Sequence, residues 1–106
     1  ICAFWPTGTL PKDAFQPVHS TVPTLVLSGE LDPVTPPARG TEVSATLSSS
    51  RHLIAPGVGH GVSSQGCVPR LIAALMETGN VGGLDTSCMK GYSAPPFFLS
   101  FAGPPP

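Results

Sequence analysis

Two short apolar runs, separated by a helical stretch, constrain this chain more than any other feature. Residues 22–28 and 51–55 are rich in apolar and branched side chains, and a glycine or a proline–glycine pair ends each run. Such runs fit strands that are buried on both faces, as in a parallel sheet. Apolar positions in residues 38–47, between the runs, roughly keep helical spacing. A strand, helix, strand order with so long a connection predicts two parallel neighbours in a right-handed unit, and hence an α/β fold.

Two helices are expected, one on each side of the second strand in sequence. The hydroxyl of Thr35 is a candidate cap for the first helix, with Pro36 and Pro37 in its first turn. Residues 67–78 carry an apolar stripe at helical spacing, and Gly79 offers a stop. Such a stripe predicts core packing rather than a cofactor groove. It consists of Val68, Leu71, Ile72, Leu75 and Met76.

The chain is interpreted as a single segment over residues 1–106. Residues 1–20 are broken by prolines and predict a loop that leads into the first strand. Residues 21–79 hold the strand, helix, strand, helix order, and residues 80–106 predict a loop and an extended proline-rich tail. Because the sequence starts at Ile1 with neither Met nor a leader, we expect a piece of a longer protein, with an N-terminally processed chain as the alternative.

The charge composition excludes several classes of function. Only 10% of the residues are charged, against about 25% in typical soluble domains, which suits a piece whose surfaces are partly covered by something else. The net charge is −1, and the five basic residues are scattered, so we expect no nucleic-acid partner. The apolar runs are far shorter than the roughly 20 residues of a membrane-spanning helix.

The cysteines favour an oxidising compartment over a metal site. Cys2, Cys67 and Cys88 are too widely spaced for a zinc knuckle or a C-x-x-C redox pair. We therefore expect no metal and no cofactor. Disulfides fit this spacing better, and the odd count leaves one cysteine that is either free or paired outside this sequence.

An acid and a histidine follow the two predicted strands and are the candidate catalytic residues. Asp32 comes just after the first run, with Pro33 stiffening its turn, and His60 lies among glycines after the second. Parallel neighbours would bring both to the carboxyl edge of the sheet, where α/β proteins place their sites. There the carboxylate can accept the Nδ1 hydrogen of the imidazole and stabilise its protonated form. A turn or helix-capping acid is the alternative for Asp32.

The remaining ionisable candidates carry weaker signals. His19 and His52 have no comparable context and are interpreted as surface or packing residues. Glu30 could bind a substrate amine, but a solvated loop acid explains it equally well.

The acid and histidine motifs together carry a resemblance to a known family. Residues 29–36 (Gly-Glu-Leu-Asp-Pro-Val-Thr-Pro) and residues 56–61 (Pro-Gly-Val-Gly-His-Gly) resemble the C-terminal part of TAP-like (tripeptidyl-aminopeptidase-like) α/β-hydrolases, relatives of proline iminopeptidases. The resemblance implies that Asp32 is the triad acid and His60 the general base. It also implies that the two strands are the last of the sheet and that residues 67–78 are the closing helix. Family members are mostly secreted or envelope hydrolases that cleave peptides from the N-terminus, and some are described as esterase-like.

The sequence departs from this family in lacking a nucleophile. α/β-Hydrolases carry the serine in a Gly-x-Ser-x-Gly elbow that precedes the acid. Only Ser20 and Ser28 precede Asp32, and neither has those glycines; the nearest matches, residues 61–65 and 91–95, follow the histidine. We therefore expect the chain alone to be inactive. It is either a fragment of a serine peptidase, a piece that completes an enzyme with a separate N-terminal part, or a non-catalytic binding or structural domain.

Two further expectations concern the ends of the segment. A disulfide between Cys67 and Cys88 could staple the tail to the last helix, and would contribute roughly 3 kcal/mol in the chain-entropy model. A reactive Cys67 thiol is the alternative. Cys2 would then pair upstream of this sequence. The edge of a truncated sheet would invite pairing with another chain, so we expect self-association, in a secreted or periplasmic setting.

Overall fold

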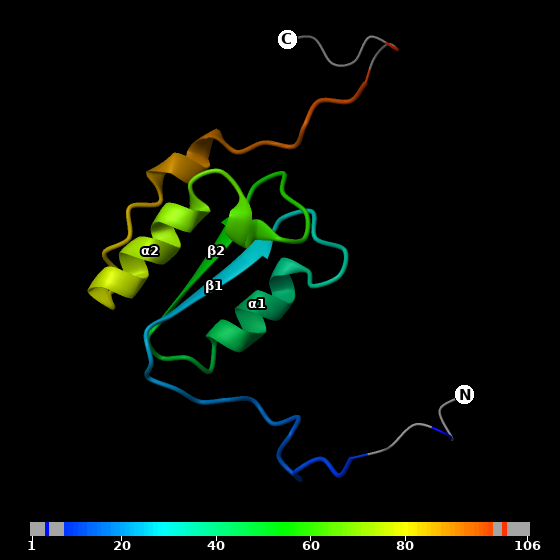
Figure 1. Ribbon diagram of the computed structural model, residues 1–106, viewed down its shortest axis with the longest axis vertical. Coiled ribbons are helices and arrows are strands. Elements are labelled where there is room, and N and C mark those ends of the chain that lie inside the picture. The colour runs from blue at the N-terminus through cyan, green and yellow to red at the C-terminus, as the bar shows by residue number, and fades with distance from the viewer. Residues whose placement is uncertain (1–3, 5–7, 99–100, 102–106) are drawn as a thin grey trace.

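A computed structural model describes Phe4, residues 8–98 and Phe101 (Figure 1). The two strands pair in parallel and are joined by a helical crossover, so the predicted α/β fold class is confirmed. The main elements, in chain order, are β1 (Thr24–Gly29), α1 (Pro37–Ser44), β2 (Ser50–Ala55) and α2 (Val68–Thr78), with 3-10 turns η2 (Val62–Ser64) and η3 (Ser87–Gly91).

The sheet lies between the two helices, with a different kind of contact on each face. The register pairs Val26 with His52 and Leu27 with Leu53, so alternate residues point to opposite faces. The face towards α2 is apolar and forms the core. This core consists of Leu53, Ala55, Val62, Cys67, Val68, Leu71 and Met89, with Leu25 and Leu27 packed against it.

The opposite face lies under α1 and carries Ser28 and His52 together with Val26 and Ile54. Because Ile54 is 45% exposed, the prediction that the strands are buried on both faces is wrong for this face. His52 Nε2 lies 2.9 Å from the buried Ser28 Oγ, and His52 Nδ1 lies 3.5 Å from Thr41 Oγ1 on the helix. A Cβ placed on Gly40 would collide with His52 and Ser28, so α1 lies directly against the strands at this point. These contacts make His52 a packing residue, as the sequence predicted.

The first helix differs from the prediction at both ends. Its N-cap is Pro36 and no side chain caps it, so the assignment of the cap to Thr35 is wrong. Its C-terminal end is Ser44 rather than residue 47, because Leu47 makes a parallel bridge with Ser20. That bridge ties the end of the lead-in segment to the turn between α1 and β2.

The second helix agrees with the prediction more closely. It begins one residue later than expected, at Val68, and Gly79 ends it in the left-handed conformation with φ 63°. The apolar stripe is narrower than predicted, because Met76 is 82% exposed while Val68 and Leu71 are buried.

The chain after α2 returns along the helix and is fixed at several points. Arg51, at the start of β2, donates to the carbonyls of Val81 (3.3 Å) and Leu84 (2.7 Å) and to the hydroxyl of Thr86 (3.0 Å). The predicted Cys67–Cys88 disulfide is present and joins the start of α2 to η3. η3 was not expected in a stretch predicted to be loop.

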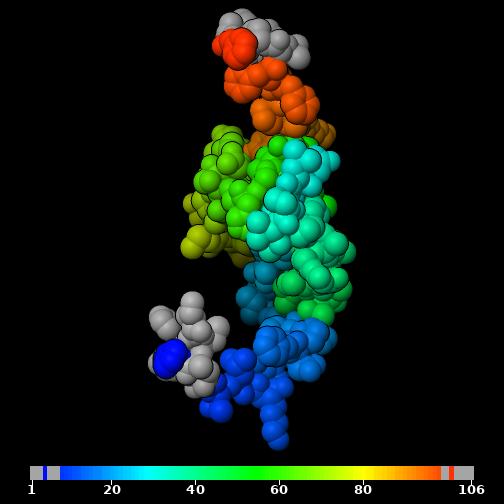
Figure 2. Space-filling model, turned by 90° about the vertical axis from the view of Figure 1, so that its right-hand side faces the viewer, coloured from blue at the N-terminus to red at the C-terminus, as the bar shows by residue number. Residues whose placement is uncertain are grey.

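The two terminal segments leave the helix–sheet body in opposite directions (Figures 1 and 2). Phe15, Phe97 and Phe98 are highly exposed along them. Predictions for Cys2 and for residues 104–106 lie outside the described residues.

Candidate acid and base pair

The carboxyl ends of β1 and β2 lie side by side, and the loops that follow them pack against each other. Gly29, the last residue of β1, pairs with Ala55, the last residue of β2. The backbone amide of Leu31 donates to the Val58 carbonyl at 2.9 Å. A Cβ at Gly29 would overlap the carbonyl oxygens of Val58 and Gly59, so only glycine allows this close approach. The strand ends therefore fix the relative position of the two loops.

Glu30 also holds the loop after β1 against the loop after β2. Its backbone amide donates to the Ala55 carbonyl at 3.0 Å, and its carboxylate oxygen Oε2 accepts the Gly57 amide hydrogen at 2.8 Å. Glu30 therefore braces the loop that carries His60.

The carboxylate of Asp32 is buried, and the hydrogen-bond donors of its own loop surround it. Its Oδ1 accepts from the backbone amides of Val34 at 2.8 Å and Thr35 at 3.1 Å. Its Oδ2 accepts from the Thr35 hydroxyl at 2.8 Å and lies 2.9 Å from His60 Nδ1. Both oxygens thus have two partners, which is close to the accepting capacity of a carboxylate.

These hydrogen bonds keep Asp32 ionised. Burial alone would raise the pKa of its carboxyl group, but the Thr35 amide, His60, the Thr35 hydroxyl and the Val34 amide together outweigh it. The pKa is therefore held well below the usual range of a carboxyl group. Asp32 can accept hydrogen bonds from its neighbours but does not donate one.

The hydrogen of the neutral His60 ring follows from this arrangement. An ionised carboxylate only accepts, so the nitrogen that faces it, Nδ1, carries the hydrogen. The other nitrogen, Nε2, then has a free lone pair. The His60 side chain is 63% exposed, in contrast to 4% for Asp32, so the imidazole is open to a substrate or a partner group. This is the geometry of a general base held by a buried acid.

The sequence located Asp32 and His60, and the structure brings them into contact across 28 residues of chain. Their catalytic roles stay a prediction. The sequence analysis missed the hydrogen bonds of Thr35 to Asp32, because it assigned Thr35 to the helix as a cap. The signal was present, because a hydroxyl three residues after an acid can turn back to the carboxylate as well as cap a helix.

None of the described serines has a hydrogen bond to His60. Ser28 contacts a histidine, but that histidine is His52, and the pair lies beneath α1 against Gly40. A substrate cannot reach it there. Neither Ser63 nor Ser93 has a hydrogen bond to His60 in the described part of the chain, and neither stands in a nucleophile elbow.

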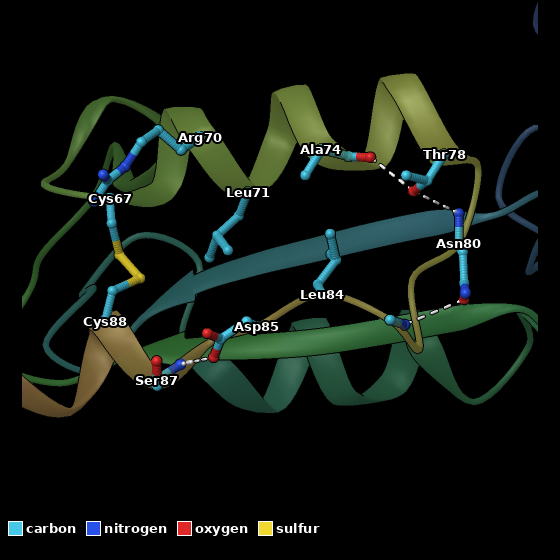
Figure 3. Close-up of a pocket in the computed structure, with 11 residues that line it drawn as sticks. Cys67, Arg70, Leu71, Ala74, Thr78, Asn80, Leu84, Asp85, Ser87 and Cys88 are labelled. Atoms are coloured by element: carbon cyan, nitrogen blue, oxygen red, sulfur yellow. Dashed lines mark hydrogen bonds between the residues drawn. A yellow bond between two sulfur atoms is a disulfide. The ribbon is translucent and has the colours of Figure 1, made fainter.

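A separate cavity of about 440 Å³ lies between α2 and the returning chain (Figure 3). The Cys67–Cys88 disulfide closes one end, Leu71 and Leu84 line its middle, and neither Asp32 nor His60 reaches it. In the ranges that the structure describes, no three His, Cys, Asp or Glu side chains gather to hold a metal ion. No described helix is long and apolar enough to cross a membrane.

Comparison with known proteins agrees with this geometry. Residues 1–88 match the model of an α/β-hydrolase family described as TAP-like protein. Neither the curated proteins nor the solved structures gave a match. The matched range includes both strands, both loops and the disulfide. This chain therefore belongs to the TAP-like family of α/β-hydrolases.

Proposed function

We propose that this chain supplies the acid and the base of a serine hydrolase, and that the nucleophilic serine and the oxyanion hole come from polypeptide outside these 106 residues. One observation carries the proposal: the Nδ1 of an exposed His60 lies 2.9 Å from the buried, ionised carboxylate of Asp32. Membership of a hydrolase family supports it.

In this mechanism His60 moves one proton, and Asp32 stabilises the charge that the proton brings to the ring. His60 Nε2 removes the proton from the serine hydroxyl as the hydroxyl attacks the scissile carbonyl. Asp32 stays ionised and stabilises the imidazolium that results. The imidazolium then gives the proton to the leaving group, and a water molecule repeats the cycle to release the acyl group.

The proposed substrates are peptides cleaved from the N-terminus, with esters as the runner-up. This assignment rests on the resemblance of residues 29–36 and 56–61 to tripeptidyl-aminopeptidase-like enzymes. A secreted or periplasmic setting is part of the proposal, and the Cys67–Cys88 disulfide supports it, since disulfides persist in oxidising compartments.

The test uses the protein expressed from its complete reading frame, whatever its length. Hydrolysis of free and N-acetylated tripeptidyl amides and of a small ester is measured for the wild type, His60→Gln and the control His19→Gln, which alters an exposed histidine in the lead-in segment. We expect His60→Gln to lower kcat by about 10⁴-fold and His19→Gln to leave it unchanged. We also expect N-acetylation to block cleavage of the tripeptidyl amide.

Two results would count against the proposal. Equal activity in His60→Gln and the wild type would remove His60 from the chemistry and favour a binding or structural domain. Stoichiometric labelling of a serine in the 106-residue chain by a fluorophosphonate probe would contradict a nucleophile that lies elsewhere. Cleavage of the acetylated substrate would contradict only the exopeptidase assignment.

A further inference from the structure

We infer that Thr35 is a positioning residue for the acid and base pair, an inference that rests on the function proposed above. Thr35 contacts the Asp32 carboxylate with two separate groups: its amide reaches Oδ1 at 3.1 Å and its hydroxyl reaches Oδ2 at 2.8 Å. The same hydroxyl oxygen lies 3.4 Å from His60 Nδ1. Among the described residues, Thr35 is thus the one that contacts both members of the pair.

The direction of the hydroxyl bond follows from its chemistry. A threonine hydroxyl has a single hydrogen, and the ionised Oδ2 of Asp32 is a nearer and stronger acceptor than a ring nitrogen. Because that hydrogen goes to Asp32, the hydroxyl offers only lone pairs to His60. Both neighbours of Nδ1 are therefore acceptors, which favours the ring form with hydrogen on Nδ1.

The hydroxyl also fixes the carboxylate oxygen that the base requires. Oδ1 is held by two backbone amides of its own loop, which a residue of any type at 34 and 35 (proline excepted) would supply. Oδ2 receives only the Thr35 hydroxyl and His60 among the described partners. Without the hydroxyl, the Oδ2 contact would depend on the exposed imidazole alone. The hydroxyl is thus placed to keep Oδ2 aimed at Nδ1 while the ring takes up and releases a proton.

Packing does not explain why position 35 carries a threonine. The Thr35 side chain is exposed, and the helix that begins after it has no side-chain cap. A role in the turn alone would be served by the backbone amide. The specific feature is therefore the hydroxyl, which serine can replace and valine cannot.

The experiment compares Thr35→Val, Thr35→Ser and the control Thr41→Val in the protein expressed from its complete reading frame. Thr41 is the matched control because its hydroxyl also lies beside a histidine nitrogen, that of His52. We expect Thr35→Val to lower kcat by about 10- to 100-fold with KM nearly unchanged, the range for a hydrogen bond to a charged group. Thr35→Ser and Thr41→Val should stay within about threefold of the wild type, and thermal unfolding confirms that each variant is folded.

A double-mutant cycle separates positioning from a structural effect. If Thr35 acts through Asp32, adding Thr35→Val to Asp32→Asn should cost no further activity. An equal loss in both backgrounds, or failure of Thr35→Ser to retain activity, overturns the inference. If Asp32→Asn alone leaves kcat unchanged, it is the proposed function that fails.

Discussion

Asp32 Oδ2 and His60 Nδ1 lie 2.9 Å apart, although 28 residues of chain separate them. The acid is buried and the histidine is exposed, so the pair combines a fixed charge with an accessible base. The parallel strands make this possible, because each of the two loops begins where its strand ends. We propose that this pair is the acid and base of a hydrolase.

The lowered pKa of Asp32 predicts how stability depends on pH. Its carboxyl group binds a proton less readily in the folded chain, so the ionised group stabilises the fold above its unfolded pKa of 3.8. That contribution is lost as the pH falls from there towards the lower pKa of the folded state. Urea unfolding should show a wild-type advantage over Asp32→Asn at pH 5 that shrinks below pH 4. An advantage that grows on acidification would contradict the hydrogen-bond assignment.

Adding a side chain at Gly29 is predicted to lower stability, whereas adding one at Gly59 is not. In Gly29→Ala the new Cβ meets backbone carbonyls of Val58 and Gly59, which cannot move aside without displacing the His60 loop. We expect a loss of about 1–3 kcal/mol in the free energy of unfolding. The control is Gly59→Ala, whose Cβ would meet nothing, and it should stay within about 0.5 kcal/mol of the wild type. Equal effects of the two variants would show that the loop does not pack against Gly29.

Arg51 predicts a cost from unpaired carbonyl groups. Arg51→Met removes the donors to Val81, Leu84 and Thr86 while keeping most of the side-chain volume. Leaving these partly buried acceptors without a donor should cost about 1–3 kcal/mol by urea unfolding. Arg39→Met, which breaks only an exposed pair with Glu42, should cost less than about 0.5 kcal/mol. If Arg51→Met leaves the free energy of unfolding unchanged, water replaces these hydrogen bonds without cost, and the prediction is wrong.

Opening the disulfide is predicted to lower the free energy of unfolding. Cys67 and Cys88 close a loop with a sequence separation of 21, and opening it should cost about 3 kcal/mol in the chain-entropy model. Peptide mapping before and after reduction should identify this pairing, and Cys88→Ser should lower the urea midpoint to that of the reduced wild type. Free thiols at both positions, or no change on reduction, would refute the link.

The strands and the site pair were predictable because their signals are local. The apolar runs ended by glycine place Asp32 and His60 after two strands, and parallel pairing then places both at one edge. The disulfide was one of two alternatives for Cys67, the other being a reactive thiol, because Cys88 lies only 21 residues further along the chain.

The features that the sequence did not predict depend on which of several contacts forms in the fold. Thr35 could cap a helix or bind Asp32, and only the fold brings the carboxylate and His60 within its reach. Leu47 was assigned to a helix by spacing, but its bridge with Ser20 required knowing where the lead-in segment runs. The role of Arg51 depends on carbonyls some 30 residues away in sequence, which no local pattern reveals.

The most direct measurement is the position of the ring hydrogen of His60, read by nitrogen NMR of the labelled chain. In the wild type we predict that the neutral imidazole carries hydrogen on Nδ1 and leaves Nε2 bare, because Asp32 accepts at 2.9 Å. Asp32→Asn should abolish this preference. A neutral wild-type ring with its hydrogen on Nε2 would contradict the assignment of His60 as a base held by Asp32.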